Sequence, residues 1–358
     1  MIAAPAIGAA WAGKMGQPLV ASLPARYIAA MTAPPPLWTH ARLSVAPMMD
    51  WTDRHCRFFH RQMTRQALLY TEMITAHAIV HGPCDRLLGY DATEQPVALQ
   101  LGGSDPALLA EAVRLAAPYG YAEFNLNVGC PSDRVKSGCF GAVLMKDPAL
   151  VADCLRAMIA ASPVEVTVKC RIGVDDQDPE LVLPDFLARC ADAGVRRVAI
   201  HARKAWLQGL SPKENREIPP LDYPLVLRMK GRFPGLHISV NGGIASLDQA
   251  RGFLEAGLDG VMIGRAAYHE PWEALSGVDA AIFGGLPGPA PTEVALAMRP
   301  YIQNHLDGGG RLHQITRHML GLFHGRPGAR HWRRILSEGA NRDGAGWGLI
   351  ERALSTVA

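Results

Sequence analysis

The 358-residue sequence lacks C-x-x-C pairs, and its seven cysteines are irregularly spaced. This pattern argues against a zinc site and against a disulfide framework, so we expect no bound metal and a reducing, cytoplasmic location. No apolar run reaches the roughly 18 residues that a membrane-spanning helix needs, and we therefore expect no membrane partner. The net charge of +3 is too small to indicate a nucleic acid or a membrane surface by itself.

Hydrophobic residues are abundant, at 49% of the chain against 19% charged residues. A chain of this length and composition can bury at least one large core, which excludes disorder of the whole protein. Residues 1–40 differ, because they are rich in Ala and Pro. Their first basic residue, Lys14, follows apolar residues instead of preceding them as in a signal peptide. We expect a poorly ordered extension here.

From residue 43 onward, short apolar runs rich in β-branched residues alternate with longer stretches of helical periodicity. Eight such units over about 240 residues match a (β/α)8 TIM barrel in number and size, and we predict this fold for residues 41–284. A doubly wound sheet is the alternative, but no G-x-G-x-x-G motif opens the first unit. The expected strands are 43–49, 68–74, 97–103, 122–128, 164–171, 196–203, 237–243 and 260–266. The expected helices include 105–117, 147–161, 180–193 and 246–256.

The last part of the chain, residues 285–358, is predicted to be a linker and a small all-helical domain. It opens with the turn-forming stretch GGLPGPAP and then shows helical periodicity without a convincing strand. Between residues 299 and 342 there are eight Arg, no Lys and two acidic residues. The planar guanidinium group suits phosphate, so this region predicts contact with a nucleic-acid backbone. A solvated helical surface is the alternative.

Polar residues and glycines stand at the expected C-terminal ends of the strands, where TIM barrels carry their active sites. The loops after strands seven and eight, which often bind phosphate in this fold, contain Gly242, Gly243, Gly264 and Arg265. A ligand with a phosphate group is expected there, with Ser246 capping the next helix; two ordinary turns are the alternative. The strand-end residues are Pro47, Met48, Gln100, Asn127, Cys130, Lys169, Arg171, His201, Arg203, Asn241, Gly242, Gly243, Gly264 and Arg265.

Lys169 lies on an otherwise apolar strand, where a buried ammonium group needs an anionic or electron-rich partner. His201 and Gln100 are expected to offer hydrogen bonds toward the same cavity, as suits a flat heteroaromatic ligand. The alternative for Lys169, His201 and Gln100 is that each is an interior polar residue whose hydrogen bonds are satisfied within the protein. Lys169 is alternatively a Schiff-base lysine of an aldolase-like enzyme.

Residues 125–142, NLNVGCPSDRVKSGCFGA, leave the fourth strand and form a long loop with several glycines, of a kind that can close over a substrate. At its head stands Cys130. A thiol with a pKa of about 8.5 is mostly protonated at neutral pH and can serve as a general acid. Reduction of a polarised C=C bond needs such an acid, because a hydride reaches one carbon and a proton must reach the other. Cys139 in the same loop is a competing candidate. The other cysteines expected to be buried and inert are Cys56, Cys154, Cys170 and Cys190.

Several motifs support a resemblance to a known family. They are APMMDWTDR (46–54), LNVGCPS (126–132), VKCRIG (168–173), IHAR (200–203), NREIPPL (215–221), VNGGI (240–244) and MIGRA (262–266). Together they resemble the flavin-dependent tRNA-dihydrouridine synthases over about residues 42–340. The segments HARKAWLQGLSPKENREIPPL and GARHWRRILSEGA are particularly similar to the A subfamily.

The resemblance implies a cytoplasmic enzyme, expected to be a monomer, that reduces uridine to 5,6-dihydrouridine at positions 20 and 20a of the tRNA D-loop. It implies bound FMN, NADPH as the reductant, Cys130 as the proton donor and Asn127 in contact with the target uracil. The implied FMN contacts are Pro47, Met48, Met49, Gln100, Lys169, His201, Asn241, Gly242, Gly243, Gly264 and Arg265. The implied tRNA contacts are Lys213, Arg216, Arg330 and Arg333.

The segment from Arg203 to Pro220 is also long for a barrel loop and carries Lys204, Lys213 and Arg216. It predicts a second RNA contact, with a tolerated surface insertion as the alternative. Two other functions remain open at this point. One is an FMN-dependent reductase or dehydrogenase of a free pyrimidine such as dihydroorotate, which leaves the arginine-rich end without a role. The other is an RNA-binding module on a catalytically inactive barrel.

Overall fold

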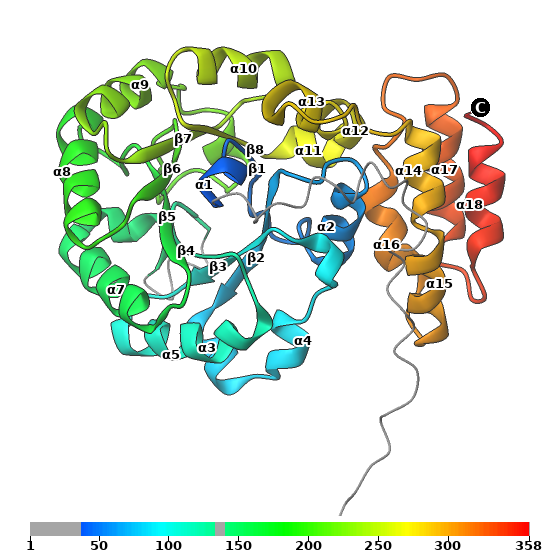
Figure 1. The fold of residues 1–358 in the computed structure, drawn as a ribbon, viewed down its shortest axis with the longest axis horizontal. Coiled ribbons are helices and arrows are strands. Elements are labelled where there is room, and N and C mark those ends of the chain that lie inside the picture. The colour runs from blue at the N-terminus through cyan, green and yellow to red at the C-terminus, as the bar shows by residue number, and fades with distance from the viewer. Residues whose placement is uncertain (1–36, 133–139, 358) are drawn as a thin grey trace, which may run out of the picture. The chain divides into compact units, whose positions relative to one another are not determined.

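The structure, a computed structural model, describes residues 37–132 and 140–357 of the chain (Figure 1). These residues belong to one compact unit that spans Leu37–Ala358. The predicted extension lies outside the described residues except for its last four, which form the helix α1 (Leu37–His40). Cys139, the competing candidate for the general acid, also lies outside the described residues.

Eight parallel strands pair in chain order and close into a barrel, which confirms the predicted (β/α)8 fold (Figure 1). Strand β1 closes the barrel by pairing with β8, where Ser44 lies opposite Met262. Each strand begins within one residue of its expected start, and β1 ends four residues early, ahead of Pro47, which has no N–H for a sheet ladder. The strands are β1 (Leu43–Val45), β2 (Leu68–Thr75), β3 (Val97–Gly102), β4 (Glu123–Val128), β5 (Glu165–Arg171), β6 (Arg197–His201), β7 (His237–Asn241) and β8 (Gly260–Ile263).

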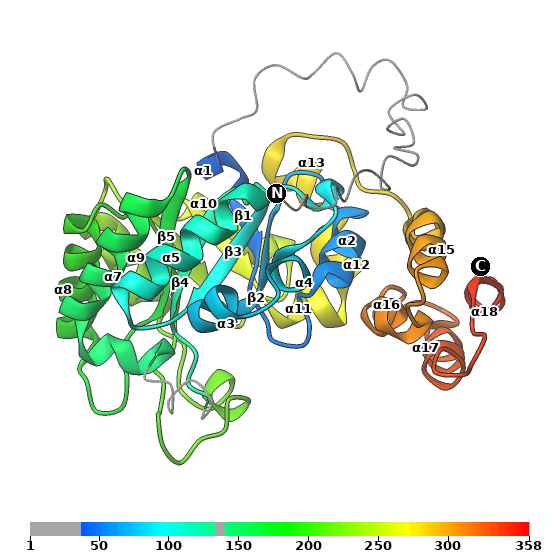
Figure 2. The same cartoon turned by 90° about the horizontal axis from the view of Figure 1, so that it is seen from below.

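Helices surround the strands and bury their apolar faces against the sheet (Figures 1 and 2). The four expected helices are present with ends within one residue of prediction. Three of them begin with an Asp N-cap followed by Pro, a pair that satisfies a free backbone N–H and fixes the first helical φ. The helices of the barrel after α1 are α2 (Arg54–Arg61), α3 (Ala76–His81), α4 (Cys84–Leu88), α5 (Pro106–Ala116), α7 (Pro148–Ala161), α8 (Pro179–Asp192), α9 (Tyr223–Arg232), α10 (Leu247–Glu255), α11 (Arg265–His269), α12 (Pro271–Leu275) and α13 (Val278–Phe283).

A charged cluster lies inside the barrel near the first residues of the strands. Glu123 is fully buried and accepts hydrogen bonds from the Tyr70 hydroxyl, at 2.6 Å, and from the Thr167 hydroxyl. The buried guanidinium group of Arg197 forms ion pairs with both Glu123 and Glu165. Charges removed from water need such partners, because an unpaired buried charge is strongly destabilising.

A helical region follows α13 and contacts the barrel through helix α2. Arg317 and His318 of α16 bind the carboxylate of Asp53, the N-cap residue of α2, at 2.5 and 3.1 Å. Burial raises the pKa of Asp53, but the hydrogen bonds and charge of His318, together with Arg317, outweigh it and hold that pKa well below its ordinary value. The helices in the described part of this region are α14 (Pro291–Ala297), α15 (Arg299–Asp307), α16 (Leu312–Met319), α17 (Ala329–Gly339) and α18 (Trp347–Leu354).

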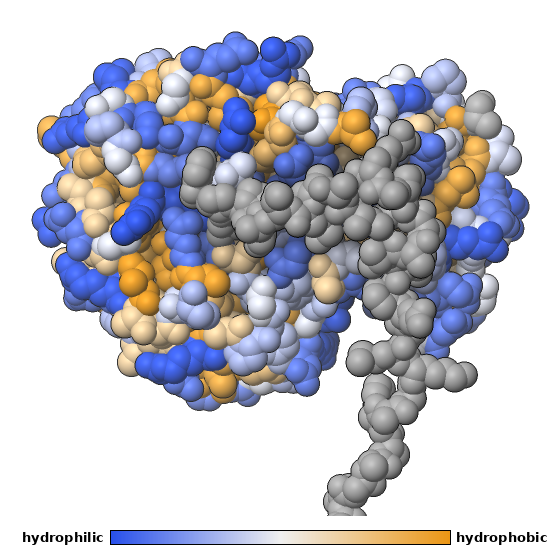
Figure 3. Space-filling view, in the orientation of Figure 1, coloured by the Kyte–Doolittle hydropathy of each residue, from blue (hydrophilic) through white to orange (hydrophobic). Residues whose placement is uncertain are grey.

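These helices confirm the predicted helical character of the C-terminal part, and α18 is a helix that was not predicted separately. The division of the chain into two domains at residue 285 stays a prediction. Hydrophilic side chains cover most of the outer helices on the face drawn in Figure 3. Among the described residues, none of the helices combines the length and the hydrophobicity that spanning a bilayer requires.

We expect Arg197→Met to lower the free energy of unfolding by about 3–5 kcal/mol, because it leaves Glu123 buried without its charged partner. Urea unfolding followed by circular dichroism measures the change. Arg189→Met, which breaks the exposed pair with Asp185 on α8, is the matched control and should change stability little. Equal effects of the two substitutions would contradict the importance of the buried pair.

Candidate active site

The C-terminal ends of the strands bring the predicted site residues to one end of the barrel, the lower end in Figure 2. The parallel register places Asn127 beside Lys169, and it places His201 between Arg171 and Asn241. The remaining predicted cofactor contacts lie on β3, in the loops that directly follow β1, β7 and β8, or at the start of α11. These are Pro47, Met48, Met49, Gln100, Gly242, Gly243, Gly264 and Arg265.

The loop after β7 requires both of its glycines. Gly242 and Gly243 have φ values of 112° and 69°, which side chains disfavour. A Cβ atom on Gly242 would also lie 2.5 Å from Cδ2 of His201, so this backbone packs directly against the imidazole ring. Tyr223 supports the loop by donating its hydroxyl hydrogen to the Gly242 carbonyl at 2.6 Å. Ser246 caps α10 by accepting from the N–H of Gln249, as expected from the sequence.

The loop after β8 differs from the loop after β7. Gly264 has a negative φ of −106°, whereas both glycines after β7 have a positive φ. A Cβ atom there would lie 3.9 Å from Sδ of Met48, which shows that the first loop comes close to this one. The side chain of Arg265 is paired with Glu217 at 2.6 Å. An anion bound at this loop would therefore share Arg265 with Glu217.

Lys169 and His201 are polar groups inside the barrel without partners. Neither side chain has a hydrogen bond or an ion pair with any residue that the structure describes. Burial, followed by the charge of Arg171, lowers the pKa of Lys169 to about 8. The same two causes hold the pKa of His201 well below 6.5, so its imidazole is neutral at neutral pH. Lys169 is half-buried and His201 is buried, and both lie near the C-terminal ends of neighbouring strands without a hydrogen-bond partner in the described chain. Polar groups in such a position usually have a partner, so the pair indicates a ligand site.

Asn127 fixes the backbone that carries Cys130. Its side-chain carbonyl accepts the N–H groups of Gly129 and Cys130, both at 3.0 Å. Its amide group donates to Oε1 of Gln100 at 2.8 Å. The half-buried thiol of Cys130 lies 3.4 Å from the hydroxyl of Ser132. Asn127 therefore determines where the thiol stands, a role that the sequence did not reveal.

The same hydrogen bonds continue down the barrel interior. Gln100 donates to Asn125 at 2.8 Å, Asn125 donates to Thr167 at 2.7 Å, and Thr167 donates to Glu123. We call the side chains of Asn127, Gln100, Asn125, Thr167 and Glu123 the polar column. Residues two apart on a strand face the same side, so the spacing of the two asparagines in N-L-N was the available signal for it. Gln100 keeps one amide hydrogen free for the FMN contact implied by the resemblance.

Arg171 joins two loops next to Cys130, the loop after β4 and the connection after β6. Its buried guanidinium group donates to the carbonyls of Gly129 at 3.1 Å, Lys204 at 3.1 Å and Asn215 at 2.9 Å. Because Gly129 directly precedes Cys130, Arg171 holds this turn against the long connection after β6. The sequence placed Arg171 at a strand end but did not predict this function.

Three cations interact electrostatically with the sulfur of Cys130: Lys169, Arg171 and Arg216. The four cysteines expected to be inert are all buried, and burial raises the pKa of their thiols, to about 12 for Cys154 and Cys170. Within the described ranges, Cys130 is thus the cysteine that stands at a strand end among positive charges.

The residues implied to contact tRNA fall into two groups. Lys213 and Arg216 lie at the 3-10 helix η6 (Glu214–Arg216), in the connection after β6 and near the strand ends. Arg330 and Arg333 are exposed on α17, in the helical region, and the structure does not bring them together with the strand ends. Residues three apart share a helix face, so these two arginines present one cationic edge.

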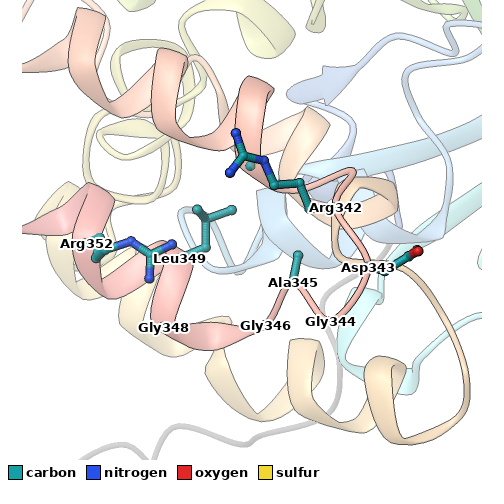
Figure 4. A pocket seen from close by; sticks show the side chains of 9 residues that line it. Arg342, Asp343, Gly344, Ala345, Gly346, Gly348, Leu349 and Arg352 are labelled. Atoms are coloured by element: carbon teal, nitrogen blue, oxygen red, sulfur yellow. The ribbon is translucent and has the colours of Figure 1, made fainter.

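The helical region also contains a pocket of about 370 Å³ between the end of α17 and α18 (Figure 4). Arg342 and Arg352 border it, together with Leu349 and exposed glycine backbone. Neither guanidinium group has an ion pair within the described part of the chain. The pocket adds two free cations to this region and lies apart from the strand ends.

Comparison with known proteins decides the family. Residues 44–357 match the family described as dihydrouridine synthase. The chain belongs to the dihydrouridine synthase family. It is therefore a flavin-dependent enzyme that reduces uridine to dihydrouridine.

Two relatives carry the name tRNA-dihydrouridine(20/20a) synthase. The protein of Xanthomonas campestris pv. campestris is 56% identical over 325 residues, which are 90% of this chain and 96% of that protein. The protein of Escherichia coli K12 is 57% identical over 319 residues, which are 88% and 92% of the two chains. Among solved structures, an old yellow enzyme homologue from Zymomonas mobilis matches with a TM-score of 0.49 and 12% identity, covering 64% of this chain and 86% of that one. That distant likeness carries no functional argument.

The strand ends of this dihydrouridine synthase fit a flavin with a phosphate tail. Lys169 and His201 supply unpartnered polar groups inside the barrel, as the edge of a heteroaromatic ring requires. The backbone N–H groups of Gly243 and Gly264 donate no hydrogen bond to any described residue, which leaves them available to an anion.

We expect Asn127→Leu to lower the free energy of unfolding by about 2–4 kcal/mol, because the N–H groups of Gly129 and Cys130 lose their acceptor. Chemical unfolding of the flavin-loaded protein measures this loss. Asn304→Leu on the exposed face of α15 is the control and should have little effect. An equally small effect at Asn127 would mean that the turn does not depend on this amide.

We compare the free energy of unfolding of the flavin-free enzyme with that of its flavin-free Lys169→Met variant. The value for the wild type minus that for the variant should rise between pH 8 and pH 10. Lys169 has a pKa of about 8 in the folded protein against an ordinary 10.5. In that pH range the unfolded chain therefore binds the additional proton, and stability increases as the proton is withdrawn. Below pH 8 both states are protonated and the difference should be flat. A difference independent of pH up to 10 would show that the ammonium group is well solvated.

Proposed function

We propose that this chain reduces uridine to 5,6-dihydrouridine at positions 20 and 20a of the tRNA D-loop, with bound FMN and NADPH as the reductant. The observation that carries the proposal is the 55–57% identity to relatives named tRNA-dihydrouridine(20/20a) synthase, over nearly the whole of both chains. The placement of Cys130, Lys169 and His201 around one end of the barrel supports it.

Cys130 is the proton donor of the proposed reaction. When bound, reduced FMN supplies a hydride to C6 of the uracil. The Sγ–H bond of Cys130 breaks as a C5–H bond forms, so the thiol ends as a thiolate. The positive charges of Lys169, Arg171 and Arg216 lie near the sulfur, and Asn127 holds the backbone that carries it.

FMN binding is assigned to the strand ends and the loops that follow them. Lys169 and His201 supply hydrogen bonds to the ring and the ribityl chain, and both lack another partner in the described chain. The phosphate is assigned to the loops after β7 and β8, where two glycine N–H groups are free and Arg265 is close. The full set of proposed contacts is Pro47, Met48, Met49, Gln100, Lys169, His201, Asn241, Gly242, Gly243, Gly264 and Arg265.

A uracil stacked in folded tRNA has to leave its stack to enter the barrel, at a cost of a few kcal/mol. Contacts with the phosphate backbone elsewhere must offset that cost. We assign them to Lys213 and Arg216 beside the barrel opening and to Arg330 and Arg333 on α17, all four of which are exposed. Asn127 is assigned a contact with the target uracil, through the amide hydrogen that its bond to Gln100 leaves free.

The other functions considered for the sequence account for less of the structure. A reductase of free pyrimidines leaves the exposed cations of α17 and the Figure 4 pocket without a role. An aldolase-like lysine does not use Cys130, and an inactive barrel uses neither residue. The cytoplasmic location and the monomeric state stay predictions.

Cys130→Ala should retain FMN and tRNA binding but lose reduction of uridine by about 100-fold or more, the usual contribution of a general acid. Dihydrouridine formed in unmodified tRNA under single-turnover conditions is the quantity to measure. Cys84→Ala removes a half-buried thiol on α4 and serves as the matched control. Normal turnover of Cys130→Ala would reject this thiol as the acid and point to Cys139 or water.

Mass-spectrometric mapping of tRNA tests the function itself. Cells that lack this protein should lose dihydrouridine at positions 20 and 20a and keep it elsewhere in the D-loop. Turnover of free uracil or dihydroorotate at the rate of tRNA by the purified enzyme would instead favour a small-molecule reductase.

A further inference from the structure

The connection after β6 is built around one buried side chain, Asn215. Its side-chain carbonyl accepts the N–H of Trp206 at 2.7 Å, and its amide group donates to the Trp206 carbonyl at 2.9 Å. The same amide group also reaches the Leu210 carbonyl at 3.1 Å. Because Asn215 has no exposed surface, these bonds are protected from water. A single residue, Asn215, therefore binds both the N–H and the carbonyl group of Trp206.

A second set of hydrogen bonds holds the residues on either side of Trp206. Ala205 exchanges backbone bonds with the segment after β5, donating to Gly173 at 3.0 Å and accepting from Asp175 at 2.8 Å. Leu207 donates its N–H to the Asp175 carboxylate at 2.8 Å. Ala205 and Leu207 are buried, whereas Trp206 between them is 37% exposed. The indole is therefore on the solvent side of a backbone that these hydrogen bonds hold in place.

The connection that carries Trp206 has more basic than acidic side chains. The ammonium group of Lys204 lies 5.4 Å from the centre of the indole ring. Residues 203–217 contain four basic side chains and two acidic ones, and one of the acidic pair, Glu217, is neutralised by Arg265. The indole nitrogen donates no hydrogen bond to any described residue. A rigid, exposed aromatic ring among cations has the composition of a surface that stacks the bases of single-stranded nucleic acid.

The position of Trp206 relates it to the active site. The guanidinium group of Arg171 binds the carbonyl of Lys204, two residues before Trp206, and that of Asn215, whose side chain holds the Trp206 backbone. It also binds the carbonyl of Gly129, which precedes Cys130. The loops that carry the indole and the thiol are thus joined through one side chain. Figure 2 shows the connection after β6 projecting from the lower end of the barrel, the end at which the strands finish.

We propose that Trp206 is a stacking platform for the RNA base next to the one that enters the barrel. This proposal rests on the proposed function. When the target uridine leaves its stack, the neighbouring base loses one stacking partner and exposes a flat apolar face. A rigid indole replaces that partner at small entropic cost, and Lys204 stands where it can neutralise the phosphate between the two nucleotides. An uninterrupted RNA duplex offers no such face, so the platform selects unpaired loops.

The test uses the flavin-loaded enzyme and full-length tRNA in which 2-aminopurine replaces each neighbour of the target uridine in turn. Stacking on Trp206 should quench the fluorescence of one of the two substrates on binding. Trp206→Leu keeps an apolar side chain without a ring and should abolish the quenching, whereas Trp206→Phe should retain most of it. In parallel, kcat/KM for dihydrouridine formation should fall roughly 10-fold in Trp206→Leu and far less in Trp206→Phe.

The matched control is Leu181→Ala, which removes another exposed apolar side chain, on α8, and should change neither quantity. Unchanged quenching and kcat/KM in Trp206→Leu would overturn the platform, as would equal losses in the Leu and Phe variants. The fluorescence reports stacking without turnover. A wild-type enzyme that quenches the probe but forms no dihydrouridine would therefore overturn the proposed function and leave the platform standing.

Discussion

The hydrogen bonds of the Asn127 side chain are the constraint on which the reactive end of the barrel depends. One carbonyl oxygen holds two consecutive N–H groups, the second of which belongs to Cys130. The polar column then extends this restraint to Glu123 and its buried ion pair with Arg197. Each member is satisfied by the next, so the loss of one link exposes unpaired polar groups in a low-dielectric interior. The position of the thiol therefore depends on the same hydrogen bonds that stabilise the barrel interior.

Arg171 gives the same end of the barrel its second restraint. TIM barrels place function in loops, and loops need external bonds to hold a fixed geometry. Here one buried guanidinium group binds carbonyls from the loop after β4 and from the connection after β6. Its positive charge also lies near the sulfur of Cys130, so a single residue both orders the loops and places a cation near the thiol.

Much of the site could be predicted from the sequence. In a barrel the C-terminal ends of all strands lie at one end, so the positions of the strands in the sequence show which residues meet there. The motif residues on β3 to β7 lie where the alternation of strands and helices predicted them. The bonds between these residues were not predictable. Asn127 was expected at the uracil, yet its carbonyl holds the Cys130 turn, and Arg265 was expected to be free for phosphate, yet it pairs with Glu217. Such contacts join residues 3 to 48 positions apart, and periodicity carries no information about them.

The sequence by itself determined the barrel, its eight strands and the helical C-terminal region, because hydrophobic periodicity and capping residues act over a few neighbouring positions. Its motifs also determined the family. Only the tertiary structure decided which polar groups are paired, which remain free and which side chains are forced outward. Lys169 is unpartnered and Trp206 exposed because of how distant loops and strands pack around them. Packing of that kind depends on three-dimensional register, which local patterns do not encode.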